Sequence, residues 1–194
     1  MLDTHGRKYI APVIDGAARG LLKLRLNANQ VTFGALVFGI LAGVLIFHGQ
    51  VVFALLSLWF SGFLDAVDGS MARMSKTSSP WGTVLDITYD RIAETGVILG
   101  LAFRYPEAMW AMLLLTSAII ISMTVFLTVG AVAEKKGVKS FYYQVGLAER
   151  TEGFIMLSAM MLFSNYLALL TLIFAGMVIF TAAQRFMEAR RILE

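Results

Sequence analysis

Four aspartates and two glycines recur at helical spacing on two neighbouring apolar segments of this chain. They are Asp65, Asp68, Gly69, Gly82, Asp86 and Asp90. Carboxylates in segments this apolar are costly to bury, usually mark a functional site and need a compensating partner. Their hard oxygen ligands suit Mg²⁺ or Mn²⁺, and the chain has no cysteine to favour zinc. The pattern therefore predicts a divalent-cation site.

The spacing places each pair of aspartates on one face of a helix. Asp65 and Asp68 are three residues apart, and Asp86 and Asp90 are four apart. A short connection over residues 74–81 makes the two helices antiparallel neighbours. Both pairs then lie near the same ends of their helices, so we expect the four carboxylates to converge.

Four converging carboxylates would repel one another, and two bound divalent cations relieve that repulsion. A two-metal site of this kind is suited to displacement at phosphorus. Gly69 and Ala72 leave the helix face bare for a ligand, and Arg73 can bind phosphate oxygens with its forked guanidinium. Taken singly, each aspartate also fits a proton relay or a metal-ion transporter, and that is the alternative function.

Composition indicates an integral membrane protein. Of the 194 residues, 58% are hydrophobic and 15% are charged, and the mean hydropathy is +0.75. Soluble domains carry roughly 25% charged residues. Lipid forces a spanning segment to satisfy its own backbone, so the expected fold is all-helical. The net charge of +3 needs no nucleic-acid partner, because anionic lipid headgroups or phosphorylated substrates explain it.

We predict one domain, residues 1–194, with an amphipathic helix along the membrane interface over residues 1–26 and a six-helix transmembrane bundle over residues 27–194. The expected spans are residues 29–47, 51–72, 83–103, 108–133, 151–163 and 166–181, the last helix continuing towards residue 191.

The distribution of basic residues sets the orientation. Nearly all lie at the termini and the even-numbered turns, whereas the opposite face holds only Arg104. The positive-inside rule then places both termini in the cytoplasm of a multi-pass protein of the cell membrane. Gly39 with Gly43, and Gly96 with Gly100, form small-residue pairs that permit close helix contact. Packing within one chain is the preferred reading, and a homodimer through one such face is the alternative.

The full pattern resembles the signature of the CDP-alcohol phosphotransferase (CDP-alcohol phosphatidyltransferase) family. The matching positions are Asp65, Asp68, Gly69, Ala72, Arg73, Gly82, Asp86 and Asp90. The six-span layout and the N-terminal helix also look like that family, so the resemblance covers essentially the whole chain.

The resemblance implies an enzyme of phospholipid synthesis. A CDP-linked lipid such as CDP-diacylglycerol would donate its substituted phosphate to the hydroxyl of a small alcohol or lipid acceptor, and CMP would leave. The four aspartates would bind two Mg²⁺ or Mn²⁺ ions, and Asp90 resembles the family's general base. Gly69, Ala72, Arg73 and Gly82, with Asp65 and Asp68, would line the nucleotide pocket.

Two further groups of residues complete the expected site. Asn29 and Thr32 share a helical face at the start of the first span and could reach the nucleotide, or Asn29 could cap the helix. On the acceptor side, Arg91, Lys136, Lys139 and Arg150 are candidate ligands for a phosphorylated alcohol.

The acceptor stays open at this stage. Asp90-Arg91 and the segment over residues 146–150 resemble members that use inositol phosphate, yet Gly130 and Val132 stand where those members carry basic residues. Lysines beside a membrane also contact lipid headgroups, and Arg150 could simply pair with Glu149 or Glu152. Glycerol phosphate, serine, inositol phosphate and a second lipid all remain candidates.

Overall fold

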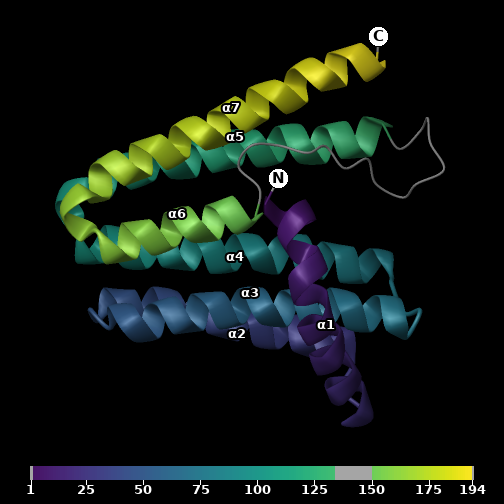
Figure 1. The fold of residues 1–194 in the computed structure, drawn as a ribbon. Helices are drawn as coiled ribbons and strands as arrows, with labels where there is room; N and C mark the ends of the chain where they lie inside the picture. The colour runs from purple at the N-terminus through teal and green to yellow at the C-terminus, as the bar shows by residue number, and fades with distance from the viewer. Residues whose placement is uncertain (1, 134–149, 194) are drawn as a thin grey trace. The chain divides into compact units, whose positions relative to one another are not determined.

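The structure is a computed structural model, and it describes residues 2–133 and 150–193. Over these residues it is helical, with no strand (Figure 1). The helices are α1 (Leu2–Lys23), α2 (Ala28–Phe47), α3 (Val51–Met74), α4 (Pro80–Arg104), α5 (Met109–Ala133), α6 (Arg150–Leu162) and α7 (Leu167–Leu193), with 3₁₀ turns at Pro106–Ala108 and Ser164–Tyr166. The predicted all-helical fold is confirmed, and each predicted span coincides with one helix.

Four segments are long and apolar enough to cross a membrane: Ala28–Phe47, Val51–Met74, Pro106–Val132 and Ser164–Arg191. The protein is therefore a multi-pass membrane protein. Helix α4 does not meet the criterion, because it carries a run of charged residues. The 13 described residues of α6 reach only about 20 Å, less than the ~30 Å of a hydrocarbon core. Six crossings remain a prediction.

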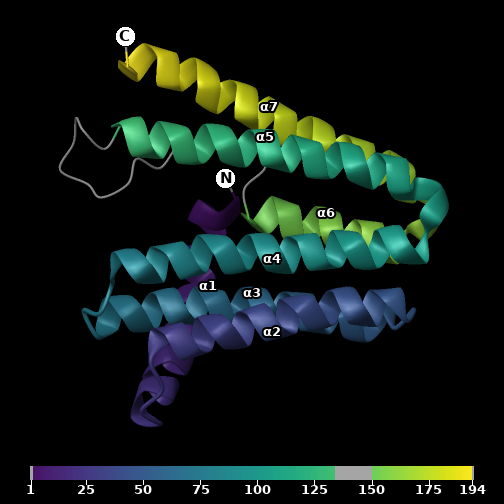
Figure 2. The ribbon, with the colours of Figure 1, turned by 180° about the vertical axis from the view of Figure 1, so that it is seen from behind.

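The chain divides into two compact units, one formed by Thr4–Pro106 and the other by Glu107–Glu194 with Met1–Asp3. In the first unit, α2 packs against both α3 and α4, and α1 crosses the bundle steeply (Figures 1 and 2). All four signature aspartates belong to this unit. A single domain over residues 1–194 remains a prediction.

Glycines bring the backbones of α2 and α4 into direct contact. A Cβ on Gly43 would lie 2.2 Å from the carbonyl oxygen of Gly96, and one on Gly100 would lie 2.2 Å from the carbonyl oxygen of Gly43. A Cβ on Gly39 would lie 2.3 Å from that of Ala93. Lipid supplies little hydrophobic drive for helix association, so such close contact is a main source of packing energy. The predicted packing within one chain is confirmed, because these glycines are in contact with the neighbouring helix of the same chain. A homodimer remains a prediction.

Two buried serines fasten α3 to α2. The Ser57 hydroxyl donates to the Phe38 carbonyl and the Ser61 hydroxyl donates to the Ala35 carbonyl, each at 2.7 Å. Buried hydroxyls require such partners. These hydrogen bonds fix the position of α3 along the axis of α2, and Ser61 lies one helical turn before Asp65.

Helix α1 packs one apolar face onto α2 and α3. Its Ala18 is buried against Val31, Val67 and Met71. Beside this cluster the Ser70 hydroxyl donates to an Asp15 carboxylate oxygen at 2.6 Å. Ile14, Ala17, Leu21 and Leu22 are partly buried against the same cluster, whereas Val13 is 62% exposed and Leu24, just after the helix, is 72% exposed.

In the second unit, α7 packs along α5 and more lightly against α6. The Thr171 hydroxyl of α7 lies 3.8 Å from the sulfur of Met112 on α5. The buried Arg185 guanidinium sits 4.9 Å from the ring centroid of Phe126. Both contacts join α5 to α7.

Candidate metal and nucleotide site

A tight, well-capped loop turns the chain from α3 into α4. Ser75 caps the end of α3, where its N–H donates to the Met71 carbonyl at 2.9 Å, and Lys76 adopts a left-handed φ of 55°. Ser79 caps α4, because its hydroxyl accepts from the N–H of Gly82 at 3.0 Å, and Pro80 occupies the first turn. The two helices are therefore antiparallel, as the sequence predicts.

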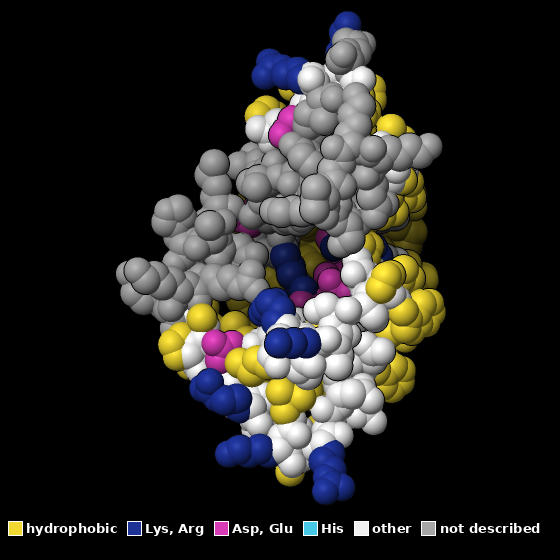
Figure 3. Space-filling model, turned by 90° about the vertical axis from the view of Figure 1, so that its right-hand side faces the viewer, with side chains coloured by type: hydrophobic (Ala, Val, Ile, Leu, Met, Phe, Trp, Pro, Cys, Tyr) yellow, Lys and Arg dark blue, Asp and Glu magenta, His cyan; other side chains and the backbone are white. Residues whose placement is uncertain are grey.

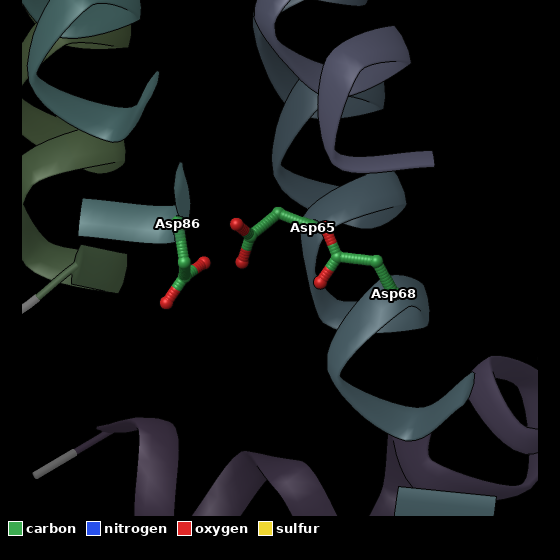
Figure 4. A group of neighbouring side chains, drawn as sticks. All are labelled: Asp65, Asp68 and Asp86. Carbon is green, nitrogen blue, oxygen red and sulfur yellow. The ribbon is translucent and has the colours of Figure 1, made fainter. Parts of the chain in front are cut away.

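This turn brings three of the four aspartates together. Ligand oxygens of Asp65, Asp68 and Asp86 all lie within 4.8 Å of one another. Figure 4 shows the Asp65 and Asp68 carboxylates extending from α3 towards the side of α4 that carries Asp86. Asp65 and Asp68 are only 8% and 6% exposed. Asp90 lies one turn further along α4, outside this group but within electrostatic range of Asp68 and Asp86.

The trio has the properties of an incomplete coordination sphere. Asp68 Oδ2 is buried and has no hydrogen-bond partner among the described residues. A buried carboxylate oxygen left this way is strongly disfavoured unless a cation or a donor reaches it. Because every donor in the group is a carboxylate oxygen, the residues present fit a hard cation such as Mg²⁺ or Mn²⁺.

Bare helix surface adjoins the carboxylates. Among the described residues, a Cβ on Gly69 would meet only Arg73 Nη1, at 3.4 Å, so the Arg73 guanidinium folds back along the helix over Gly69. Arg73 is exposed, and the half-buried Ala72 follows Asp68 by one turn. This surface is open to a ligand, with a guanidinium at its edge.

The start of α2 faces the same region. Asn29 Oδ1 lies 3.8 Å from the position of a Cβ on Gly82, and the Thr32 hydroxyl is within hydrogen-bonding reach of Asp68. That hydroxyl also lies 3.0 Å from the Ala28 carbonyl, and its single proton can serve only one of the two acceptors. The structure thus brings both predicted α2 residues to the site.

The structure also decides which asparagine caps α2. Asn27 accepts from the N–H of Gln30 at 2.9 Å, and the Gln30 side chain accepts from the N–H of Asn27 at 2.9 Å. This is a reciprocal capping box. Asn29 is therefore not the cap, and its side chain is left for another role.

The candidate acceptor residues belong to different parts of the chain. Arg91 forms an ion pair with Glu94 on the same helix. Arg150 begins α6 in the second unit, with its guanidinium carbon 5.8 Å from the ring centroid of Phe154. Lys136 and Lys139 lie outside the described residues. The ion pair between Arg91 and Glu94 could have been predicted from the sequence, because residues three apart are neighbours on a helix surface.

Comparison with known proteins agrees with the fold and with the family resemblance. The family model for CDP-alcohol phosphatidyltransferase matches residues 25–184. Phosphatidylinositol phosphate synthase of Corynebacterium glutamicum is 31% identical over 163 residues, which cover 80% of this chain and 72% of that protein. The inner membrane protein YnjF of Escherichia coli is 30% identical over 197 residues, covering 95% and 93%.

A solved structure extends the likeness to three dimensions. Phosphatidylinositol phosphate synthase (PgsA1) of Mycobacterium tuberculosis with bound CDP-DAG superposes with a TM-score of 0.73 at 25% identity, covering 92% of this chain and 94% of that one. The same enzyme in complex with manganese and citrate gives 0.72 at 26% identity, covering 91% and 88%.

This chain belongs to the CDP-alcohol phosphatidyltransferase family. It is a membrane-embedded transferase of phospholipid synthesis.

Proposed function

We propose that this enzyme transfers a phosphatidyl group from a CDP-linked lipid such as CDP-diacylglycerol to the hydroxyl of an acceptor alcohol. The observation that carries this is the trio of the buried Asp65 and Asp68 with the half-buried Asp86, whose ligand oxygens lie within 4.8 Å of one another beside Gly69. The acceptor oxygen forms a bond to the phosphorus of the donor, the bond from that phosphorus to CMP breaks, and the hydroxyl proton is released.

Asp65, Asp68, Asp86 and Asp90 would hold two Mg²⁺ or Mn²⁺ ions. The orphaned oxygen of Asp68 and the all-carboxylate donor set support this, as does the manganese in the M. tuberculosis structure. When bound, such ions neutralise phosphate oxygens and the leaving group.

The other predicted site residues would bind the CDP-linked donor. Arg73 would bind diphosphate oxygens, while Gly69, Ala72 and Gly82 leave room for the nucleotide and Asn29 and Thr32 contact it. These assignments rest on the positions described above and on the CDP-DAG bound by the M. tuberculosis enzyme.

Asp90 would accept the proton of the attacking hydroxyl. It lies beyond the trio on α4, so it sits at the edge of the carboxylate group instead of its centre. A general base must reach the acceptor hydroxyl directly or through one water.

We also propose six membrane crossings, with α1 along the cytoplasmic interface and both termini in the cytoplasm. Figure 3 views the side where the α3–α4 loop lies and shows several Lys and Arg side chains there. In the first unit, the exposed basic residues at this end are Arg19, Lys23, Arg25, Arg73 and Lys76. The exposed Ile10 and Val13 of α1, and Leu24 just after it, offer apolar contacts for a membrane surface. The E. coli relative's description as an inner membrane protein supports the plasma membrane.

The test is CMP release by the purified protein. With Mn²⁺ or Mg²⁺ and CDP-diacylglycerol, we expect release that depends on an alcohol from a panel of acceptors. Asp90→Asn should abolish turnover and retain binding of CDP-diacylglycerol, because the change removes the base and keeps the shape. Glu107→Gln, at an exposed carboxylate in the other unit, is the matched control and should turn over normally.

Two results would contradict the proposal. Undiminished turnover by Asp90→Asn would show that Asp90 is not the general base. Absence of CMP with every acceptor, together with ion flux in liposomes, would favour a metal-ion or proton-coupled transporter.

A further inference from the structure

A hydrogen bond joins α1 to the stretch of α3 that carries the site. The buried Ser70 hydroxyl donates to Asp15 Oδ1 of α1 at 2.6 Å, a separation typical of a charge-assisted bond from a hydroxyl to a carboxylate. Other helical serines of this protein, such as Ser117 and Ser158, donate to a carbonyl of their own helix four residues earlier. A hydroxyl has one proton to donate, so Ser70 uses it to hold α1 and not the preceding turn of its own helix.

The two aspartates of α3 lie between two fastened positions. On one side of them, Ser61 donates to a carbonyl of α2, and on the other side Ser70 donates to Asp15 of α1. Asp65 and Asp68 fall between these two serines in the sequence. The bond to α2 therefore fixes one end of the carboxylate-bearing stretch, and the bond to α1 fixes the other.

Helix α1 supports this stretch from the side away from the site. At 3.6 residues per turn, Val67, Ser70 and Met71 share one face of α3, and the two site aspartates point roughly the opposite way. Val67 and Met71 are buried in one cluster with Ala18 of α1. Asp86 belongs to α4, which packs against α2. The contact with α1 therefore helps to set where the α3 aspartates lie relative to Asp86.

We propose that Asp15 is a positioning residue of the site: through Ser70 it holds the end of α3 where the two α3 aspartates and Asp86 can share a divalent cation. This inference rests on the proposed metal site and transferase function. Asp15 acts through its hydrogen bond and not as a ligand. Because the distances from a metal to its ligands hold to within about 0.2 Å, a small movement of α3 is enough to weaken binding.

The experiment measures Mn²⁺ binding directly, by titrating the full-length protein in detergent and following free Mn²⁺ by electron paramagnetic resonance. Asp15→Ala and Ser70→Ala should each raise the Kd for Mn²⁺ about tenfold, the lower end of the loss caused by removing an outer partner of a metal ligand. Both variants should fold. In Asp15→Ala, the Ser70 hydroxyl can donate to the Ala66 carbonyl of its own helix, and in Ser70→Ala, the half-buried Asp15 keeps access to water.

The kinetics should separate a displaced site from a damaged enzyme. In the CMP-release assay, the Mn²⁺ concentration that gives half the maximal rate should rise by the same factor as the Kd in both variants. At saturating Mn²⁺ and donor, kcat should stay within about twofold of the wild type, because the reacting groups are unchanged. General loss of folded protein would instead lower kcat and leave the half-maximal Mn²⁺ concentration unchanged.

Three control variants isolate the hydrogen bond. Asp15→Asn keeps an acceptor oxygen and removes the charge, so its Kd for Mn²⁺ should stay within about threefold of the wild type. The double variant Asp15→Ala with Ser70→Ala should bind no more weakly than either single variant, because both changes remove the same bond. Ser117→Ala removes an exposed hydroxyl that donates within α5 and should bind Mn²⁺ like the wild type.

The outcomes distinguish this inference from the function on which it rests. Wild-type Mn²⁺ affinity in a folded Asp15→Ala or Ser70→Ala variant would overturn it, as would additive losses in the double variant. An equal loss in Asp15→Asn and Asp15→Ala would attribute the effect to charge and overturn it too. Each of these results leaves the transferase intact. Absence of both Mn²⁺ binding and CMP release in the wild type would refute the proposed function itself.

Discussion

Replacing Asp68 by Asn should have opposite effects on the stability of the metal-free protein and on metal binding. Ligand oxygens of Asp68 lie within 4.8 Å of those of Asp65 and Asp86. At that separation, two unit charges repel by about 3.5 kcal/mol at an effective dielectric constant of about 20. Charge spread over two oxygens, solvent and counter-ions relieve much of this, so we expect Asp68→Asn to stabilise the metal-free protein by about 1–3 kcal/mol.

The assay is thermal unfolding in detergent, with EDTA and then with Mn²⁺. In EDTA, Asp68→Asn should melt roughly 2–12 °C above the wild type. Mn²⁺ should raise the melting temperature of the wild type and have little effect on Asp68→Asn, because a ligand stabilises only the state that binds it. A metal-free Asp68→Asn that melts below the wild type would refute the reasoning, since the carboxylates would then not be repelling. Equal Mn²⁺ stabilisation of both proteins would refute the metal assignment. Glu107→Gln should behave like the wild type in both conditions.

Three glycine substitutions test other parts of the first unit. Gly43→Ala should destabilise the protein by about 1–3 kcal/mol because its Cβ would overlap Gly96, whereas Gly34→Ala, whose Cβ would lie 3.7 Å from Leu64 Cδ1, should be neutral or stabilising by up to about 1 kcal/mol. Equal melting temperatures of the two variants would contradict the close backbone contact. Gly69→Leu should fold normally, since the flexible Arg73 side chain is the only neighbour within the described part of the chain, and it should raise the KM for CDP-diacylglycerol about tenfold or more. An unchanged KM for CDP-diacylglycerol would show that the donor does not bind at the surface beside Gly69.

Much of the fold could be predicted because local spacing and lipid physics constrain it. Apolar length fixes where helices lie, and the three- and four-residue intervals of the aspartates fix which side chains share a face. A short loop between α3 and α4 then forces them to be antiparallel. These local rules are sufficient to predict that Asp65, Asp68 and Asp86 lie close together, as they do in the structure.

Other features depend on contacts that sequence spacing does not encode. The hydrogen bond from Ser70 to Asp15 joins residues 55 positions apart, and nothing in either segment specifies that partner. Asn27 and Asn29 look equivalent in the sequence, yet the start of the helix makes Asn27 the cap. Asp90 fits the same face as Asp86, but one helical turn of about 5.4 Å is enough to place it outside the closest group.

Two parts of α4 impose linked requirements on the enzyme. Its first half carries Asp86 and Asp90, and their charge is a reason why α4 is not apolar enough to count as a membrane span. Its second half brings Gly96 and Gly100 against α2 with backbones in contact. Since lipid supplies little drive to bury such a helix, contact without side chains is a main source of the packing energy that offsets the cost of the charges. A methyl group inserted between α2 and α4 would also move Asp86 relative to the α3 aspartates, because α3 is fastened to α2 by Ser57 and Ser61. The small residues in the second half of α4 therefore influence the separation of the carboxylates in its first half.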